Sequence, residues 1–160
     1  MRPLVSVCIP AYNNAAYIKE TIDSVLNQTY SNLELIICDD KSKDDTVQVI
    51  ESIHDDRMKL YKNEKNLGMS GNWNHCLSKC RGEFIKLICA DDILAKNCLE
   101  KDCLNFSRPD NRLRSAVNTI RLHCSSARDG SAIANAVPLC PSIDHVRIFL
   151  DVISIISMPP

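Results

Sequence analysis

The sequence predicts an α/β protein in which a mostly parallel β-sheet is flanked by helices. Apolar runs of strand length alternate with amphipathic segments over the first two thirds of the chain, and the strands are apolar on both faces. Such strands are typical of parallel sheets whose connections are helices. The chain has 160 residues, of which 45% are hydrophobic and 24% charged, as in an ordinary globular domain.

Four segments are predicted to be strands: the third is short, and the other three are rich in apolar residues and bounded by turn residues. They are residues 4–10, 33–40, 57–63 and 82–92. The first is closed by Pro10. The second and the fourth end in paired aspartates, Asp39–Asp40 and Asp91–Asp92.

Four further segments have helical spacing of their apolar residues. They are residues 15–28, 42–53, 70–80 and 97–106. In the first, Ile18 and Ile22 lie one turn apart. Ser42, with Asp45 three residues later, predicts a capping box that begins the second helix.

The carboxyl ends of parallel strands meet at one edge of the sheet, where ligands bind. We therefore expect Tyr12, Asp40 and Asp92 to line one pocket. Carboxylate oxygens suit Mg²⁺ or Mn²⁺, and Mg²⁺ often completes its shell with phosphate oxygens. No GxGxxG or GxxxxGK[ST] loop is present to hold phosphate. The alternative is that each acidic pair caps a helix or lies in a solvated turn.

Composition excludes several other classes. A net charge of −1 argues against a nucleic-acid surface. We expect no signal peptide, and no apolar run approaches the roughly 18 residues of a membrane span. The nine cysteines contain no CxxC pair, which favours small buried thiols in a reducing compartment.

Two stretches carry a resemblance to a known family. "VSVCIPAYNNAAYIKETIDSVLNQTYSNLELIICDDKSKDDT" and "NEKNLGMSGNWNHCLSKCRGEFIKLICADD" resemble the start and continuation of a family 2 glycosyltransferase. The similarity runs over residues 3–102. It implies a Rossmann-like GT-A fold and a nucleotide-diphospho-sugar-binding domain over this range.

The resemblance also implies roles for single residues. Pro10, Ala11 and Tyr12 match the segment that packs against the nucleotide base. Asp40 matches the aspartate that hydrogen-bonds the base, typically uracil, and Asp39 precedes it as a supporting residue.

Two other matched segments concern the nucleotide loop and the metal. Asn66 and Gly68 match a loop near the nucleotide, and residues 90–92 match the metal motif called DXD, with Ala at its first position. By this resemblance Asp92 is the direct ligand of Mn²⁺ or Mg²⁺. Asp91 holds the ribose or a metal-bound water.

The family's activity is transfer of a sugar from a nucleotide-diphospho-sugar, here expected to be a UDP-sugar, to an acceptor hydroxyl with inversion. The resemblance implies a saccharide or lipid-linked acceptor, a role in polysaccharide or cell-envelope synthesis, and a place in the cytoplasm or at the inner face of the membrane. It also implies a catalytic base from the acceptor-binding half.

The resemblance stops near residue 103, and residues 103–160 are expected to be an atypical tail that comes from truncation, a shifted reading frame or a foreign segment; the alternative is a divergent tail. All lysines lie at or before Lys101, the later basic residues are arginines, and no period of 2 or 3.6 is evident. We expect this tail to be loosely packed or disordered and to lack the base. The alternative function is a catalytically incomplete module that binds nucleotide-sugar and metal. A receiver-like signalling domain is disfavoured, because its acidic pair would stand where residues 10–12 are Pro-Ala-Tyr.

Overall fold

The computed structural model describes residues 2–106 and 147–150. The strands are β1 (Val5–Ala11), β2 (Leu33–Asp39), β3 (Met58–Lys62), β4 (Phe84–Leu87) and β5 (Arg147–Leu150). The helices are α1 (Ile18–Leu26), α2 (Thr46–Glu51), α3 (Gly68–Lys79) and α4 (Cys98–Phe106).

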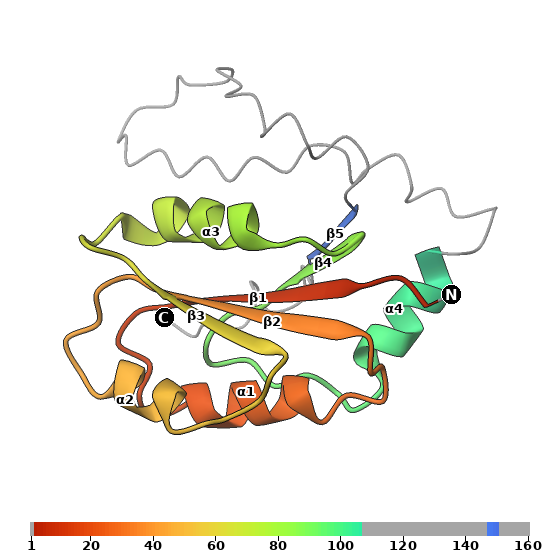
Figure 1. The fold of residues 1–160 in the computed structure, drawn as a ribbon, viewed down its shortest axis with the longest axis horizontal. Coiled ribbons are helices and arrows are strands. Elements are labelled where there is room, and N and C mark those ends of the chain that lie inside the picture. The colour runs from red at the N-terminus through yellow and green to blue at the C-terminus, as the bar shows by residue number, and fades with distance from the viewer. Residues whose placement is uncertain (1, 107–146, 151–160) are drawn as a thin grey trace, which may run out of the picture.

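The strands form one sheet in the order β3-β2-β1-β4-β5, and each of its pairings is parallel. Figure 1 shows α3 on one side of this sheet and α1 and α2 on the other. The predicted α/β class, with a parallel sheet between helical layers, is confirmed.

Alternation along β1 divides the core into two layers. Val7 and Ile9 pack in the larger layer, with apolar residues of α1, α2 and α4. Cys8 packs in the smaller layer, with Cys38 of β2 and Cys76 of α3. These three thiols are buried, as expected from the cysteine pattern. The middle strand is therefore enclosed on both faces, which explains its uninterrupted apolar sequence.

A buried lysine lies within this core. Lys86, in β4, is 1% exposed, and its ammonium group donates to Asp102 of α4 at 3.2 Å. An unpaired charge at this depth would cost several kcal/mol, so the ion pair is what allows a lysine in the strand.

The predicted start of the second helix is wrong. α2 begins at Thr46, and its N-cap residue, Asp45, makes no side-chain capping hydrogen bond. The Ser42 hydroxyl instead donates to Asp39 and accepts the backbone N–H of Asn13. Ser42 is therefore held in the loop by Asp39 at the end of β2 and by Asn13 of the loop after β1.

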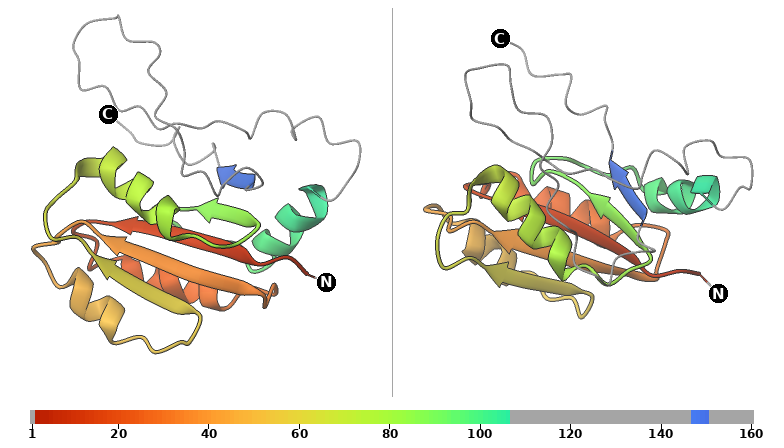
Figure 2. Two further views of the ribbon diagram at one scale, coloured as in Figure 1. Left: turned by 45° about the horizontal axis from the view of Figure 1, so that its top comes forward. Right: turned by 90° about the horizontal axis from the view of Figure 1, so that it is seen from above.

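The fourth strand is shorter than the predicted 82–92, because β4 ends at Leu87. Asp91 and Asp92 thus stand in a loop beyond the strand. β5 is an element that the sequence did not predict; it adds to the sheet beside β4, as both views in Figure 2 show. The other residues of the predicted tail beyond 106 lie outside the described residues. Within the described part of the chain, no helix is long and apolar enough to cross a bilayer.

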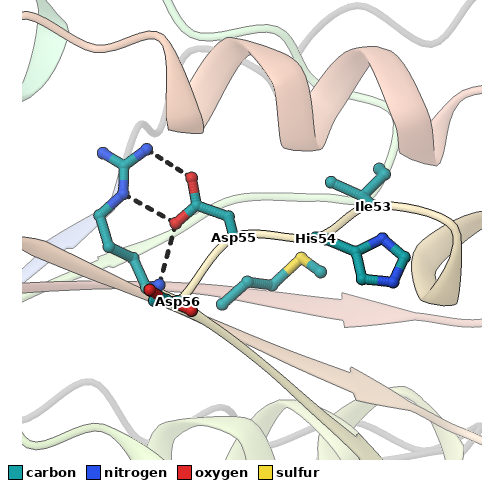
Figure 3. Close-up of a pocket in the computed structure, with 6 residues that line it drawn as sticks. Ile53, His54, Asp55 and Asp56 are labelled. Carbon is teal, nitrogen blue, oxygen red and sulfur yellow. Dashed lines mark hydrogen bonds and ion pairs between the residues drawn. The ribbon is translucent and has the colours of Figure 1, made fainter.

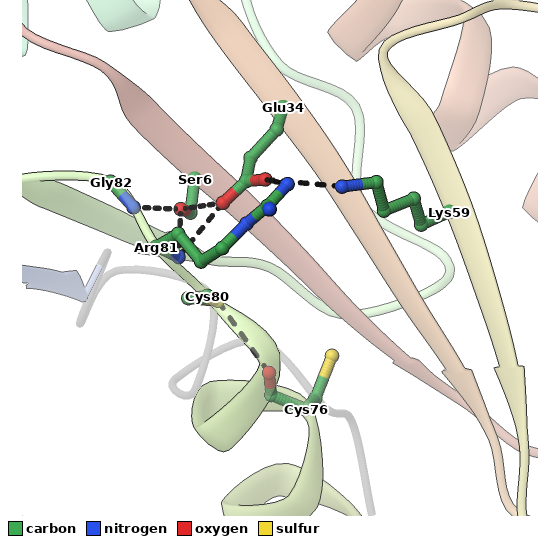
Figure 4. A network of polar contacts seen from close by, with 7 residues as sticks. All are labelled: Ser6, Glu34, Lys59, Cys76, Cys80, Arg81 and Gly82. Carbon is green, nitrogen blue, oxygen red and sulfur yellow. Dashed lines mark hydrogen bonds and ion pairs between the residues drawn. The ribbon is translucent and has the colours of Figure 1, made fainter.

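A polar network holds the amino edge of the sheet (Figure 4). The Glu34 carboxylate, on β2, accepts the Ser6 hydroxyl at 2.7 Å and the Arg81 backbone N–H at 2.8 Å. Ser6 in turn accepts the N–H of Gly82 at 2.7 Å. A Cβ at Gly82 would lie 2.6 Å from the Ser6 nitrogen, so only glycine allows the chain to enter β4 this close to β1.

This network makes stability depend on pH. Burial raises the pKa of Glu34, but the hydrogen bonds from Ser6 and Arg81 outweigh it, so the pKa lies below its ordinary value of 4.5. A carboxyl group whose pKa is lowered by folding stabilises the fold above the unfolded-state pKa. That contribution is lost as the pH falls through the folded-state pKa.

We therefore expect Glu34→Gln to lower the free energy of unfolding by about 1–3 kcal/mol at pH 7, because the amide cannot accept as many N–H and O–H groups. The difference from the parent protein should shrink as the pH falls below 4.5. Urea unfolding at several pH values measures both effects.

The matched control is Glu51→Gln, which breaks an exposed ion pair to Lys62. That pair should contribute less than about 1 kcal/mol. Equal losses in the two variants, or a Glu34→Gln difference that does not change with pH, would contradict the proposed role of the network.

Candidate functional site

Four loops leave the carboxyl edge of the sheet. They follow β1 (residues 12–17), β2 (40–45), β3 (63–67) and β4 (88–97). Because the strands are parallel, these loops begin at the same edge. The strand order reverses between β1 and β4, and such switch points are where α/β sheets bind ligands. The predicted positions after these strands are therefore brought together at one edge.

The loops after β1 and β2 are tied directly to each other. Four hydrogen bonds join them, all between a backbone N–H and a side chain: Asn13 to Ser42, Asn14 to Thr46, Ala15 to Asp44, and Lys43 to Asn13. Burial raises the pKa of Asp44, but its hydrogen bonds from Thr46 and Ala15 outweigh it and the pKa lies below its ordinary value. The two loops therefore form one unit above the strand ends.

Asp39 is a structural part of this unit. It is 2% exposed, and its carboxylate accepts both the backbone N–H of Ser42, at 3.0 Å, and the Ser42 hydroxyl. Its oxygens are thus occupied by the loop. This agrees with a supporting residue rather than one that contacts a ligand.

Asp40 is also 2% exposed but is only half occupied. Its Oδ1 atom accepts the Asn63 amide at 2.8 Å and the Leu67 backbone N–H at 2.7 Å. Its Oδ2 atom accepts no hydrogen bond from the residues that the structure describes. A buried acceptor left without a donor costs about 1–3 kcal/mol, so this oxygen is a candidate ligand contact.

Asn72, on α3, connects Asn63, the side chain that donates to Asp40, to the sheet. Its amide donates to the carbonyl oxygens of Cys38, at 2.9 Å, and Ala11, at 3.3 Å. Its own oxygen accepts the Asn63 amide at 3.0 Å. The Asn63 oxygen lies 2.6 Å from Nδ1 of His75. The strand ends, α3 and the loop after β3 therefore share one buried network.

Sequence reasoning missed Asn63 and Asn72 and gave His75 no role. The signal for Asn72 was its spacing: it lies one helical turn before Cys76, and these are the two residues of α3 that are fully buried. An amide among apolar residues on the inner side of a helix indicates a buried hydrogen-bonding role.

Asn66 and Gly68 tie the loop after β3 to Asp40. The Asn66 amide donates to the Asp40 carbonyl at 3.0 Å, and its oxygen accepts the Gly68 N–H. Gly68 has φ +72°, a conformation that glycine adopts at low cost, which lets the chain turn into α3. Their contact with a nucleotide stays a prediction.

Of the three residues predicted to contact the base, only Tyr12 is exposed. Pro10 and Ala11 are buried within β1, and Tyr12, just beyond the strand end, is 42% exposed. The ring of Tyr12 is therefore the part of this segment that a ligand at the carboxyl edge can reach.

Asp91 and Asp92 lie in the loop after β4, in a turn over residues 89–92 that is closed by the Asp92 N–H donating to the Cys89 carbonyl at 3.2 Å. The carbonyl of Ala90 is fixed by the Thr21 hydroxyl of α1 at 2.9 Å. Asp91 is exposed, and half-buried Asp92 accepts the Cys89 N–H at 3.3 Å. Burial and then the charges of Asp92 and Asp91 raise the pKa of the Cys89 thiol to about 11, so the thiol stays protonated beside them.

This donor set fits an ion such as Mg²⁺ or Mn²⁺. Ala90 offers no side-chain oxygen, and the described residues contain no cluster of three or more His, Cys, Asp or Glu that could hold a metal. Two adjacent carboxylates suffice for an ion that takes its other ligands from water and substrate phosphates. Asp92 and Asp91 are the residues that would hold it.

An open hollow elsewhere is lined by residues 53–58 (Figure 3). It lies before β3, at the amino edge of the sheet, whereas Asp40, Asp91 and Asp92 lie at the carboxyl edge. Arg57 donates to Asp55 within it and to the Leu26 carbonyl at 3.1 Å. Its polar groups thus serve the connection between α2 and β3.

Comparison with known families and proteins agrees with this arrangement. The model of the family described as Glycosyl transferase family 2 matches residues 6–112, more than half of the chain. Chondroitin synthase of Escherichia coli is 37% identical over 134 residues, which are 83% of this chain and 19% of that protein. The predicted domain boundary at residue 102 stays a prediction.

A second relative is the E. coli protein named UDP-Glc:alpha-D-GlcNAc-diphosphoundecaprenol beta-1,3-glucosyltransferase WfgD. It is 43% identical over 97 residues, or 61% of this chain and 38% of that protein. The chain thus spans less than half the length of these curated relatives.

Two solved structures are similar. S. aureus TarS 1-349 in complex with UDP has a TM-score of 0.59 at 30% identity and covers 64% of this chain and 31% of its own. The mannosyltransferase PcManGT of Pyrobaculum calidifontis, with GDP-Man and Mn²⁺, has a TM-score of 0.62 at 28% identity and covers 68% and 34%. The predicted GT-A, Rossmann-like architecture is confirmed, and the chain belongs to glycosyl transferase family 2.

Proposed function

We propose that this domain binds a UDP-sugar together with Mg²⁺ or Mn²⁺ and serves the transfer of the sugar to an acceptor hydroxyl, with inversion. The observation that carries the proposal is the half-occupied, buried carboxylate of Asp40 at the same sheet edge as the open pair Asp91–Asp92. A relative named for UDP-Glc and a similar structure in complex with UDP support it.

Each residue has a distinct task in this proposal. Asp40 accepts an N–H of the base through Oδ2, and Tyr12 packs against the base. Asp39 holds the loop that carries Asp40. Asp91 binds the ribose or a metal-bound water, and Asp92 holds the ion.

A divalent ion bound at Asp92 would supply Lewis-acid stabilisation of the charge on the diphosphate leaving group. The acceptor hydroxyl must approach from the opposite side of the sugar and lose its proton to a base. Within the described residues, no carboxylate is assigned to that base. We expect it in the acceptor-binding half, which the longer relatives have room for.

The acceptor is proposed to be a saccharide or a lipid-linked saccharide, as in polysaccharide synthesis. The name of WfgD, with its diphosphoundecaprenol acceptor, supports the lipid-linked class and a place at the inner face of the membrane. Buried thiols such as Cys8 and Cys76 agree with a reducing cytoplasm.

A second candidate function is donor binding without transfer. It is favoured by the lack of an assigned base among the described residues. The two functions differ in one observable, turnover of the sugar.

We expect Mg²⁺ or Mn²⁺ to tighten UDP binding to the parent protein. Asp92→Asn should remove that effect and leave metal-free binding unchanged, because the amide keeps the volume but not the charge. Calorimetric titration of UDP with and without Mn²⁺ measures both terms.

The matched control is Asp23→Asn on α1, an exposed residue paired with Lys19. It should keep the metal effect of the parent. Equal metal dependence in Asp92→Asn and the parent would contradict the assignment of Asp92.

We expect the 160-residue chain to bind a UDP-sugar but not to transfer it to saccharide or lipid acceptors. Loss of a general base typically costs 10²–10⁴-fold, and loss of acceptor positioning costs more. An assay with radiolabelled UDP-sugar detects both transfer and slow hydrolysis by water.

Metal-dependent transfer by this chain alone would show that it carries a base, and would favour the complete transferase over the binding module. Hydrolysis that is lost in Asp92→Asn would locate the reaction at the proposed site.

A further inference from the structure

The buried network around Asp40 has a fixed direction. The carbonyl oxygens of Ala11 and Cys38 can only accept, so the Asn72 group that contacts them must be its NH₂. The Asn72 oxygen therefore faces Asn63 and accepts a hydrogen bond from its amide, at 3.0 Å. The backbone of two strands thus orients the first amide of the chain of hydrogen bonds.

The orientation passes on to Asn63 and Asp40. The Asn63 NH₂ group donates one hydrogen bond to Asn72 and the other to Oδ1 of Asp40, at 2.8 Å. The Asn63 oxygen then has to accept from Nδ1 of His75, at 2.6 Å. Each hydrogen-bonding group of the Asn63 side chain is used, and none can be reversed without placing two acceptors or two donors against each other.

Asp40 consequently receives two donors on one oxygen, from Asn63 and from the backbone of Leu67, at 2.8 and 2.7 Å. Whatever group stands at position 40 must present an acceptor on this side. The other carboxylate oxygen, Oδ2, remains an acceptor and has no donor among the described residues. Asp40 is only 2% exposed, so this oxygen is buried.

We propose that Asn63 is a positioning residue that fixes the hydrogen-bond polarity of position 40, and thereby selects a base with a ring N–H. This rests on the proposed function. Uracil, with its N3–H, and guanine, with its N1–H, satisfy a lone carboxylate oxygen. The ring nitrogens of cytosine and adenine at the same place are acceptors and meet Oδ2 unfavourably.

The network predicts a specific effect of Asp40→Asn on the choice of base. The oxygen of the new amide must face Asn63 and Leu67, because both donate. Its NH₂ group must then take the place of Oδ2 and donate toward the ligand. The substitution should therefore reverse the polarity of the contact, from an acceptor suited to uracil to a donor suited to cytosine.

The test is calorimetric titration of the full chain with UDP and with CDP, in Mg²⁺. The parent should bind UDP at least about tenfold more tightly than CDP, because CDP would place an acceptor against the buried Oδ2 atom. Asp40→Asn should bind CDP more tightly than UDP. If Asp40 had a merely structural role, the substitution would weaken the binding of UDP and of CDP equally and leave the ratio of their affinities unchanged.

Asn63 is tested in the background of Asp40→Asn. Adding Asn63→Ala removes one of the two donors that orient the new amide, so the amide can turn and the CDP preference should fall toward an equal affinity for the two ligands. If that variant does not fold, Asn63→Ser, whose single hydroxyl proton cannot serve both Asp40 and Asn72, should reduce the preference in the same direction. The control is Asn27→Ala, at the carboxyl end of α1, where the Asn27 amide donates to the Asp23 carbonyl. In the same Asp40→Asn background it should leave the ratio of CDP to UDP affinity unchanged.

Three results would overturn the inference. They are equal binding of UDP and CDP by the parent, a retained UDP preference in Asp40→Asn, and a CDP preference that survives replacement of Asn63. In each of these the protein still binds a nucleotide, so the proposed donor site stands. Failure of the folded parent to bind any nucleoside diphosphate would overturn the proposed function and this inference with it.

Discussion

The carbonyl oxygen of Ala11 is the point at which the sheet and the candidate site are joined. It accepts the backbone N–H of Asp40 at 2.9 Å and the amide of Asn72 at 3.3 Å. Ala11 is buried and is paired with Asp39 of β2, whereas the pairing of β1 with β4 ends at Cys8. The carbonyl of Ala11 therefore cannot move without disturbing the end of the β1–β2 pairing. The loop after β2 and the first turns of α3 are therefore positioned from the middle strand of the sheet.

The two edges of the sheet are held by networks of different chemistry. At the amino edge, Glu34 is balanced by the guanidinium of Arg81 at 3.2 Å. At the carboxyl edge, the hydrogen-bond partners of Asp40 are the neutral amide of Asn63 and a backbone N–H. The first network cancels its charge, whereas the second keeps it. Under the proposed function, a negative charge at this edge suits both an N–H group of the base and a divalent cation at Asp92.

The sequence predicted the elements better than it predicted the contacts between them. Apolar runs identified β1, β2 and β4, because burial on both faces leaves a local signal. The short strand β3 is only half-buried and gives a weaker signal. Ser42 did not begin α2, because its hydroxyl bonds Asp39 and Asn13, and these partners depend on how two loops meet. Asn63 and Asn72 were missed for the same reason: each is polar and locally unremarkable, and only the packing of α3 on the strand ends makes them one network. The paired acids were found because the same residue pair follows two apolar runs of the sequence.

The acidic residues of the site differ in how far the protein prepares them. Asp40 is 2% exposed and oriented by two donors, whereas Asp91 is exposed to solvent. Under the proposed function, the base therefore meets a contact that is already in place, and the ion meets carboxylates that stay hydrated until it arrives with the diphosphate. Two protein carboxylates leave most of the ion's shell to water and phosphate oxygens. Nucleotide and metal must then bind cooperatively, and reciprocity requires that each tighten the other by the same factor. Under the proposed function, such a domain would fix the identity of the nucleotide itself and leave assembly of the metal centre to the substrate.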